Sequence, residues 1–165
     1  MIKRPSSGWE GEGSEREPGA PLGASYETTL FIRDRCLCLA SQRAARALSR
    51  MFDEALKPVG ITSGQFSLLT SLNRPEPPSI GSVATLLAMD RTTLTANLKP
   101  LERRGLLKTE VDPKDRRGRR LSLTREGLAV LDAATPIWER THVAAEARLS
   151  EGDPDLVRLG LAALA

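Results

Sequence analysis

Basic side chains are concentrated in residues 91–120, the part of the sequence with the clearest chemical character. This stretch contains ten Lys or Arg and four Asp or Glu, a net charge of +6, whereas the whole chain carries +3. The other residues therefore sum to −3. Basicity confined to one segment is typical of a surface that meets a polyanion. The first hypothesis is a nucleic-acid-binding surface built from these residues.

A predicted helix presents the first group of these side chains. Asp90 is a favourable N-cap residue, and Leu94, Leu98 and Leu101 recur at helical spacing up to Gly105, where the helix would end. Polar residues on the opposite face suit base edges and phosphates: arginine pairs with guanine, asparagine with adenine, and threonine hydroxyls donate to phosphate. The candidate contacts from this helix are Arg91, Thr92, Thr93, Thr95, Asn97 and Lys99.

The second group is predicted to lie on a β-hairpin. Residues 106–111 and 119–123 have the β-branched or alternating pattern of short strands, and they flank the polar, turn-prone sequence DPKDRRG. Repulsion among crowded basic side chains is tolerated more readily where phosphates lie nearby. The candidate contacts from the hairpin are Lys114, Arg116, Arg117, Arg119 and Arg120.

Two helices are expected well before this segment. Apolar residues recur every three or four positions from about 26 to 57, which predicts one long helix that Pro58 stops. Thr62 and Gln65 then form a capping-box pattern, which starts a helix that ends near Asn73.

A short helix capped by Ser79 completes a helix-turn-helix. Ala88 and Met89 form its turn into the helix after Asp90. Pro100 predicts a kink late in that second helix, because proline removes a backbone hydrogen bond there.

Two further helices follow the hairpin. Thr124 caps the first, which runs to about Leu149 with a bend at Pro136, and Ser150 starts the second. The apolar stripe of the last helix lies at the C-terminus, where one subunit alone would leave it exposed. This stripe consists of Leu156, Leu159, Ala163 and Leu164.

Composition excludes several classes of protein. Hydrophobic residues make up 40% and charged residues 27%, as in an ordinary globular domain, and a 4% aromatic content implies an aliphatic core. We expect a cytoplasmic protein, since no stretch resembles a membrane span or a signal peptide and the chain has only two cysteines. With His142 as the single histidine, we expect no metal site, no cofactor and no catalytic activity.

The segment LAMDRTTLTANLKPLERRGLLKTEVDPKDRRGRRLSLTREG resembles the multiple-antibiotic-resistance regulator (MarR) family. The resemblance rests on three motifs: DRTTLT at the start of the recognition helix, the D-x-R-G element at 115–118 and the L-S-L-T at 121–124. The resemblance extends from about Arg33 to the C-terminus and is strongest from Ser79 to Gly127. It implies a mainly α fold with a small β-hairpin wing: a winged helix-turn-helix with N- and C-terminal dimerisation helices.

The resemblance also implies functional roles. Arg117 would reach into the minor groove of duplex DNA, and Asp115 would support the wing by pairing with arginine. The chain would be a homodimer on a pseudo-palindromic operator, a repressor by default, released by a small aromatic or anionic effector. Candidate lining residues for that effector are Arg43, Met51, Phe52 and Phe66.

The predicted organisation is a disordered tail over residues 1–25 and one domain over 26–165. Within that domain, residues 58–124 form the DNA-binding lobe, and residues 26–57 and 125–165 form the dimerisation helices.

Two alternatives remain open. Cys38 is placed like the sensing cysteine of the family's organic-hydroperoxide regulators, but Phe52 and Ser63 stand where those regulators have tyrosine. On one continuous helix Cys36 lies on a different face and could not readily bridge to Cys38. A winged helix can also serve protein assembly without specific DNA binding.

Overall fold

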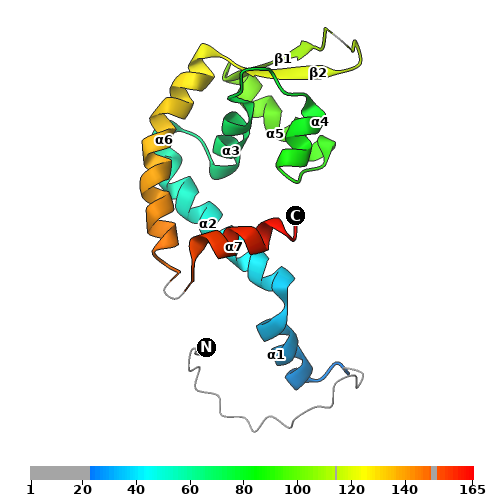
Figure 1. The fold of residues 1–165 in the computed structure, drawn as a ribbon, viewed down its shortest axis with the longest axis vertical. Helices are drawn as coiled ribbons and strands as arrows, with labels where there is room; N and C mark the ends of the chain where they lie inside the picture. The colour runs from blue at the N-terminus through cyan, green and yellow to red at the C-terminus, as the bar shows by residue number, and fades with distance from the viewer. Residues whose placement is uncertain (1–22, 114, 150–151) are drawn as a thin grey trace. The chain divides into compact units, whose positions relative to one another are not determined.

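The computed structural model describes residues 23–113, 115–149 and 152–165 (Figure 1). The disordered tail predicted for 1–25 therefore falls almost entirely outside the described residues, as do Lys114 and Ser150. Within the described ranges the chain forms mostly helices and one antiparallel hairpin, which confirms the predicted fold class. The elements are α1 (Tyr26–Arg35), α2 (Leu37–Leu56), the 3-10 helix η1 (Lys57–Val59), α3 (Ser63–Leu72), α4 (Ile80–Leu86), α5 (Arg91–Arg103), β1 (Leu107–Val111), β2 (Arg119–Leu123), α6 (Arg125–Glu146) and α7 (Pro154–Ala162).

Contacts divide the chain into two compact units, residues 1–46 and residues 47–165, with the boundary inside α2. In the first unit, the single long helix predicted over 26–57 is wrong, because the helix breaks at Cys36. Cys36 has extended backbone, its N–H closes α1 on the carbonyl of Ile32, and its Sγ accepts the N–H of Leu39 at 3.4 Å. The thiol thus acts as an N-cap, which favours a new helix start.

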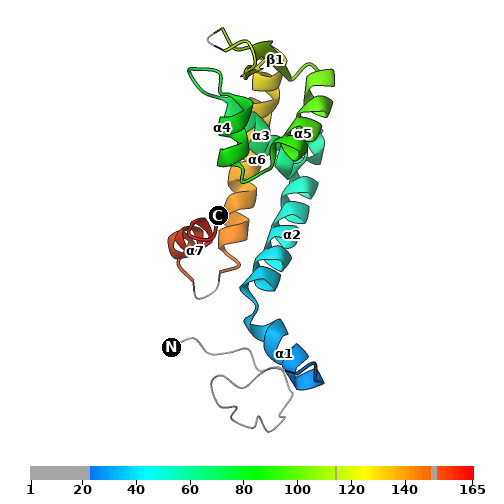
Figure 2. The same cartoon turned by 90° about the vertical axis from the view of Figure 1, so that its right-hand side faces the viewer.

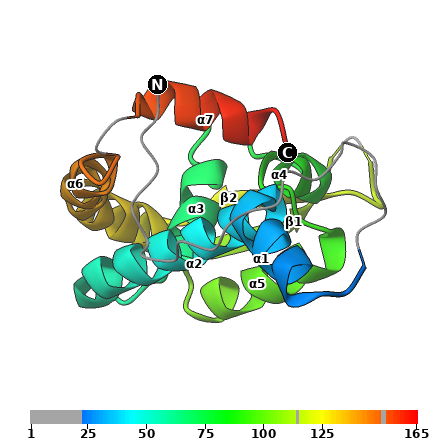
Figure 3. The same cartoon turned by 90° about the horizontal axis from the view of Figure 1, so that it is seen from below.

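The second unit is organised around an aliphatic core. Helix α3 packs between α4 and α6 (Figure 3), and the hairpin covers one end of this arrangement (Figure 1). The predicted inward residues of α5, Leu94, Leu98 and Leu101, are all buried. They meet further buried leucines from the other elements, among them Leu56, Leu68, Leu69, Leu107 and Leu121. The core therefore fixes the orientation of α5 and leaves its polar face outward.

Four of the predicted helix starts are confirmed at atomic detail. Thr62 and Gln65 make both hydrogen bonds of a capping box at α3, and the side chains of Ser79, Asp90 and Thr124 accept backbone N–H groups at the starts of α4, α5 and α6. These caps satisfy donors that the first turn of a helix leaves unpaired.

The end of α6 and the start of α7 differ from the predicted positions. Helix α6 ends at Glu146, before the predicted Leu149, and α7 begins at Pro154 with Asp153 as N-cap. Pro100 and Pro136 both lie inside continuous helices. None of the described helices combines the length and apolar character that crossing a membrane requires.

The hairpin has a register that places its tip at residues 112–118. Leu107 pairs with Leu123 at the base and Val111 with Arg119 near the tip. The segment before α4 adds to the outer edge of β2, since the N–H of Leu121 donates to the carbonyl of Pro78 at 2.9 Å and Ser79 forms a bridge with Arg120. The wing and the start of the helix-turn-helix are therefore joined by main-chain hydrogen bonds.

Gly127, in the first turn of α6, tests this packing. A Cβ at this position would lie 1.9 Å from the carbonyl oxygen of Leu106, so backbone must move to admit it. We expect Gly127→Ala to destabilise the protein by about 2 kcal/mol, although alanine is the better helix former. Gly64→Ala is the matched control in the first turn of α3, where the nearest atom is 4.0 Å away. Urea unfolding would measure both, and equal stability of the two variants would contradict the packing described.

Candidate nucleic-acid interface

The start of α5 is held by a compact set of hydrogen bonds. Ala88 adopts the left-handed conformation, with φ of 49°, in the turn that joins α4 to α5 (Figure 2). The carboxylate of Asp90 then accepts the Thr93 hydroxyl at 2.6 Å and the Thr93 N–H at 2.8 Å. These bonds, the side-chain one first, hold the pKa of Asp90 below its ordinary value of 3.8. The cap is thus ionised at neutral pH, and its stabilisation is lost as the pH falls through the lowered pKa.

The six residues predicted on α5 are all exposed, on the face opposite its buried leucines. Some of their polar groups already have internal partners. Besides the Thr93 hydroxyl, the Thr95 hydroxyl donates to the Arg91 carbonyl at 2.7 Å, and the Asn97 amide lies 3.9 Å from the Met89 sulfur. The guanidinium of Arg91 lies against Gly81 of α4. In the described chain, the Thr92 and Lys99 side chains have no recorded polar partner.

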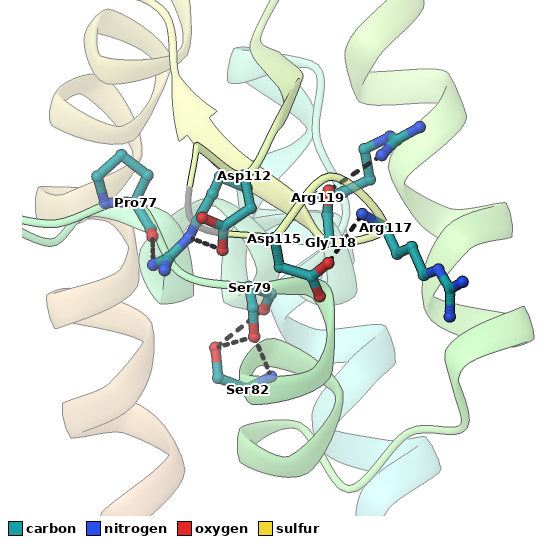
Figure 4. A network of polar contacts seen from close by, with 9 residues as sticks. Pro77, Ser79, Ser82, Asp112, Asp115, Arg117, Gly118 and Arg119 are labelled. Atoms are coloured by element: carbon teal, nitrogen blue, oxygen red, sulfur yellow. Dashed lines mark hydrogen bonds and ion pairs between the residues drawn. The ribbon is translucent and has the colours of Figure 1, made fainter.

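The tip of the wing is a folded loop with its own hydrogen bonds (Figure 4). The N–H of Asp112 donates to the carbonyl of Gly118 at 3.1 Å, and the N–H of Gly118 donates to the carbonyl of Asp115 at 2.8 Å. The guanidinium of Arg119 donates to the carbonyls of Arg116 and Gly118 at 3.2 and 3.0 Å. Arg119 thus stabilises the loop from within.

Asp115 lies in this loop, but its partner differs from the one that the resemblance implied. Its Oδ1 accepts the main-chain N–H of Arg117 at 2.9 Å, and it forms no ion pair with any described residue. The expected pairing with a guanidinium is therefore wrong in its detail. Asp115 fixes the backbone at Arg117, whose side chain projects away from the network (Figure 4).

The carboxylate that does pair with arginine is Asp112, which sequence reasoning missed. Arg120 donates from Nε to Asp112 Oδ2 at 2.7 Å and from Nη1 to the Pro77 carbonyl at 2.8 Å. These side chains are 31% and 10% exposed for Arg120 and Asp112. Arg120 was predicted to contact nucleic acid, yet its guanidinium joins the wing to the segment before α4. The only available signal was the position of Asp112 at the hairpin end, which does not reveal its cross-strand partner.

Two basic side chains at the tip are exposed and make no hydrogen bond or ion pair to another described residue. Arg116 and Arg117 are exposed, and neither guanidinium has a recorded partner within the described ranges. Lys114, the third predicted contact there, lies outside those ranges. The tip therefore presents uncompensated positive charge on a loop whose backbone is fixed by its neighbours.

The candidate effector and redox residues are spread over both units. In the second unit, Met51 and Phe52 are half-buried and Phe66 stacks on Trp138, with ring centres 6.2 Å apart. Arg43 is exposed on the part of α2 in the first unit.

Cys38 is exposed and accepts a hydrogen bond from the Gln42 amide at 3.3 Å. The argument that Cys36 and Cys38 share one helix fails, since α2 starts after Cys36.

A model of the MarR family matches residues 61–118. Transcriptional regulator HosA of Escherichia coli O111:H- is 35% identical over 98 residues, which cover 58% of this chain and 71% of that protein. The chain belongs to the MarR family. The resemblance inferred from the recognition helix and the wing motif is thereby confirmed.

Solved structures of MarR-family proteins agree with the fold. M. tuberculosis MOSR in complex with DNA aligns with a TM-score of 0.70 and 38% identity, covering 79% of this chain and 93% of that one. The repressor CouR bound to a 23-mer DNA duplex aligns with a TM-score of 0.64 and 32% identity, covering 81% and 92%. The winged helix-turn-helix is confirmed, and the MarR-family relatives are transcriptional regulators, not enzymes.

The junction between Arg120 and Asp112 can be tested by a double-mutant cycle. We expect Asp112→Ala and Arg120→Ala to be coupled by about 1–2 kcal/mol in unfolding free energy, because either single variant removes the charge-assisted bond between two largely covered side chains. Lys108→Ala with Glu110→Ala is the matched control on the same hairpin, since both of those side chains are 55% exposed. Its coupling should stay below about 0.5 kcal/mol. Equal coupling in the two cycles would show that the junction is an ordinary surface pair.

Proposed function

We propose that the chain is a sequence-specific regulator of transcription that binds double-stranded DNA with α5 in the major groove and the wing tip in the adjacent minor groove. The observation that carries this proposal is that the arginines of the wing differ in their contacts. Arg119 and Arg120 donate hydrogen bonds to other parts of the protein. The guanidinium groups of Arg116 and Arg117 are exposed and have no described partner. A narrow minor groove concentrates negative potential, which attracts such guanidinium groups. The exposed side chains of α5 supply the sequence reading.

The MarR-family relatives support this proposal. MOSR and CouR were both solved with DNA, and CouR is described as a repressor. We therefore propose repression, relieved by a small-molecule ligand that binds one state of the protein more tightly than the other.

The regulator acts as a homodimer in this proposal. Helix α7 has no buried residue, and its Leu156, Leu159 and the following Leu164 are 67%, 66% and 65% exposed. Val143 of α6 is also exposed. Apolar faces of this size are normally covered, and a second copy of the same helices covers them symmetrically. Two recognition helices would then read half-sites about 34 Å apart on one face of the duplex.

The wing contact predicts a specific change in salt dependence. On a duplex obtained by selection from random sequences, Arg117→Ala should weaken binding at least tenfold and lower the slope of log affinity against log salt by about 0.9. Lys57→Ala is the charge-matched control, since Lys57 pairs with Glu54 far from the wing in sequence. It should change neither quantity. An unchanged affinity and slope for Arg117→Ala would rule out the wing contact. If the natural chain selected no duplex at all, the alternative of an assembly module without specific DNA binding would hold instead.

The dimer predicts a change in mass. Light scattering at micromolar concentration should give twice the subunit mass for the natural chain and a lower mass for Leu159→Asp, because the charge would be buried at the interface. Leu86→Asp is the control, an exposed leucine of α4 that is outside the proposed interface. A monomeric natural chain would defeat the dimer proposal.

A further inference from the structure

A hollow of about 340 Å³ at the base of the wing has the composition of an anion site with an apolar floor. Three parts of the second unit surround it: the end of α3 with the loop after it, the end of β2, and the first turns of α6. The base and the tip are opposite ends of the hairpin, so this hollow is separate from the arginine-bearing loop at 112–118.

The floor of the hollow is aliphatic. Leu72 and Leu123 belong to or pack on the core, and Leu128 stays 42% exposed although it lies on the same helix as the buried Leu131. Pro75 and Pro77 complete this surface. None of the described residues that line it is aromatic. An aliphatic chain therefore matches the polarity of this floor.

Two unpaired guanidinium groups border the floor. Arg74 and Arg125 both line the hollow, and neither side chain has a recorded hydrogen bond or ion pair to a described residue. Arg125 is also the first residue of the 22-residue α6, whose positive end favours an anion. Guanidinium groups bind carboxylates through paired, charge-assisted hydrogen bonds.

We propose that this hollow binds an aliphatic carboxylate, with the carboxylate at Arg74 and Arg125 and the chain on Leu123 and Leu128. The proposal deepens the proposed function, because it names a second effector site and rests on DNA binding only for its regulatory consequence. Pro77 lines the hollow and its carbonyl also accepts Arg120, so a ligand that moves this loop alters the anchor of the wing. Linkage then requires that DNA change the affinity for the carboxylate by the same factor as the carboxylate changes that for DNA.

Calorimetric titration of sodium hexanoate into the full-length protein without DNA tests the site directly. We expect saturable binding by the natural chain, at least tenfold weaker binding by Arg74→Gln and by Arg125→Gln, and none of the neutral isostere hexanamide. Arg140→Gln is the matched control, an exposed arginine of α6 that does not line the hollow, and it should bind hexanoate like the natural chain. Circular dichroism checks that each variant is folded.

Three results would overturn the proposal: no saturable binding at millimolar hexanoate, equal binding by the two hollow variants and the control, or equal binding of hexanamide. A fourth concerns DNA. If Arg74→Gln or Arg125→Gln lowered both DNA affinity and its salt slope without any hexanoate, these arginines would be phosphate contacts instead. Because the titration uses no DNA, its failure leaves the proposed DNA binding intact, and a chain that fails to bind DNA could still bind hexanoate.

Discussion

The guanidinium of Arg120 connects parts of the chain that are more than forty residues apart. It reaches the carboxylate of Asp112 across the hairpin and the carbonyl of Pro77 before the helix-turn-helix. The neighbouring bond from Leu121 to Pro78 repeats this connection in the main chain. A β-hairpin alone is marginally stable in water, so its direction relative to α5 depends on such attachments. Without them, the tip and the recognition helix could not approach one duplex in a fixed geometry.

The rest of the wing follows from this constraint. With the hairpin attached to the segment before α4, the loop at 112–118 needs only local hydrogen bonds to hold its shape. Asp115 accepts the N–H of Arg117, and Arg119 donates to the carbonyls of Arg116 and Gly118. The concentrated positive charge of the hairpin is therefore not uniform in role. Two of its four described arginines, Arg119 and Arg120, donate to carbonyls and a carboxylate of the protein itself, and Arg116 and Arg117 are exposed.

Much of this architecture could be predicted from the sequence because its signals are local. Caps at Thr62, Ser79, Asp90 and Thr124 act within one turn, and the inward leucines of α5 follow helical spacing. What could not be predicted depends on distant partners. Asp112 and Arg120 meet only through the hairpin register, and their charges alone made Arg120 look like a nucleic-acid contact. The break at Cys36 was missed for another reason: a thiol is an uncommon cap, and the apolar pattern continues on both sides of it.

The measurement that tests the account most directly is the DNA affinity of Asp112→Asn on a selected operator. This change removes a negative charge beside the wing, so electrostatics alone would strengthen binding to a polyanion. If Asp112 instead holds Arg120 and thereby the direction of the wing, binding should weaken several-fold despite the more favourable charge. Tighter binding by Asp112→Asn would contradict the account, because the net charge of the wing, and not its fixed direction, would then determine the affinity for DNA.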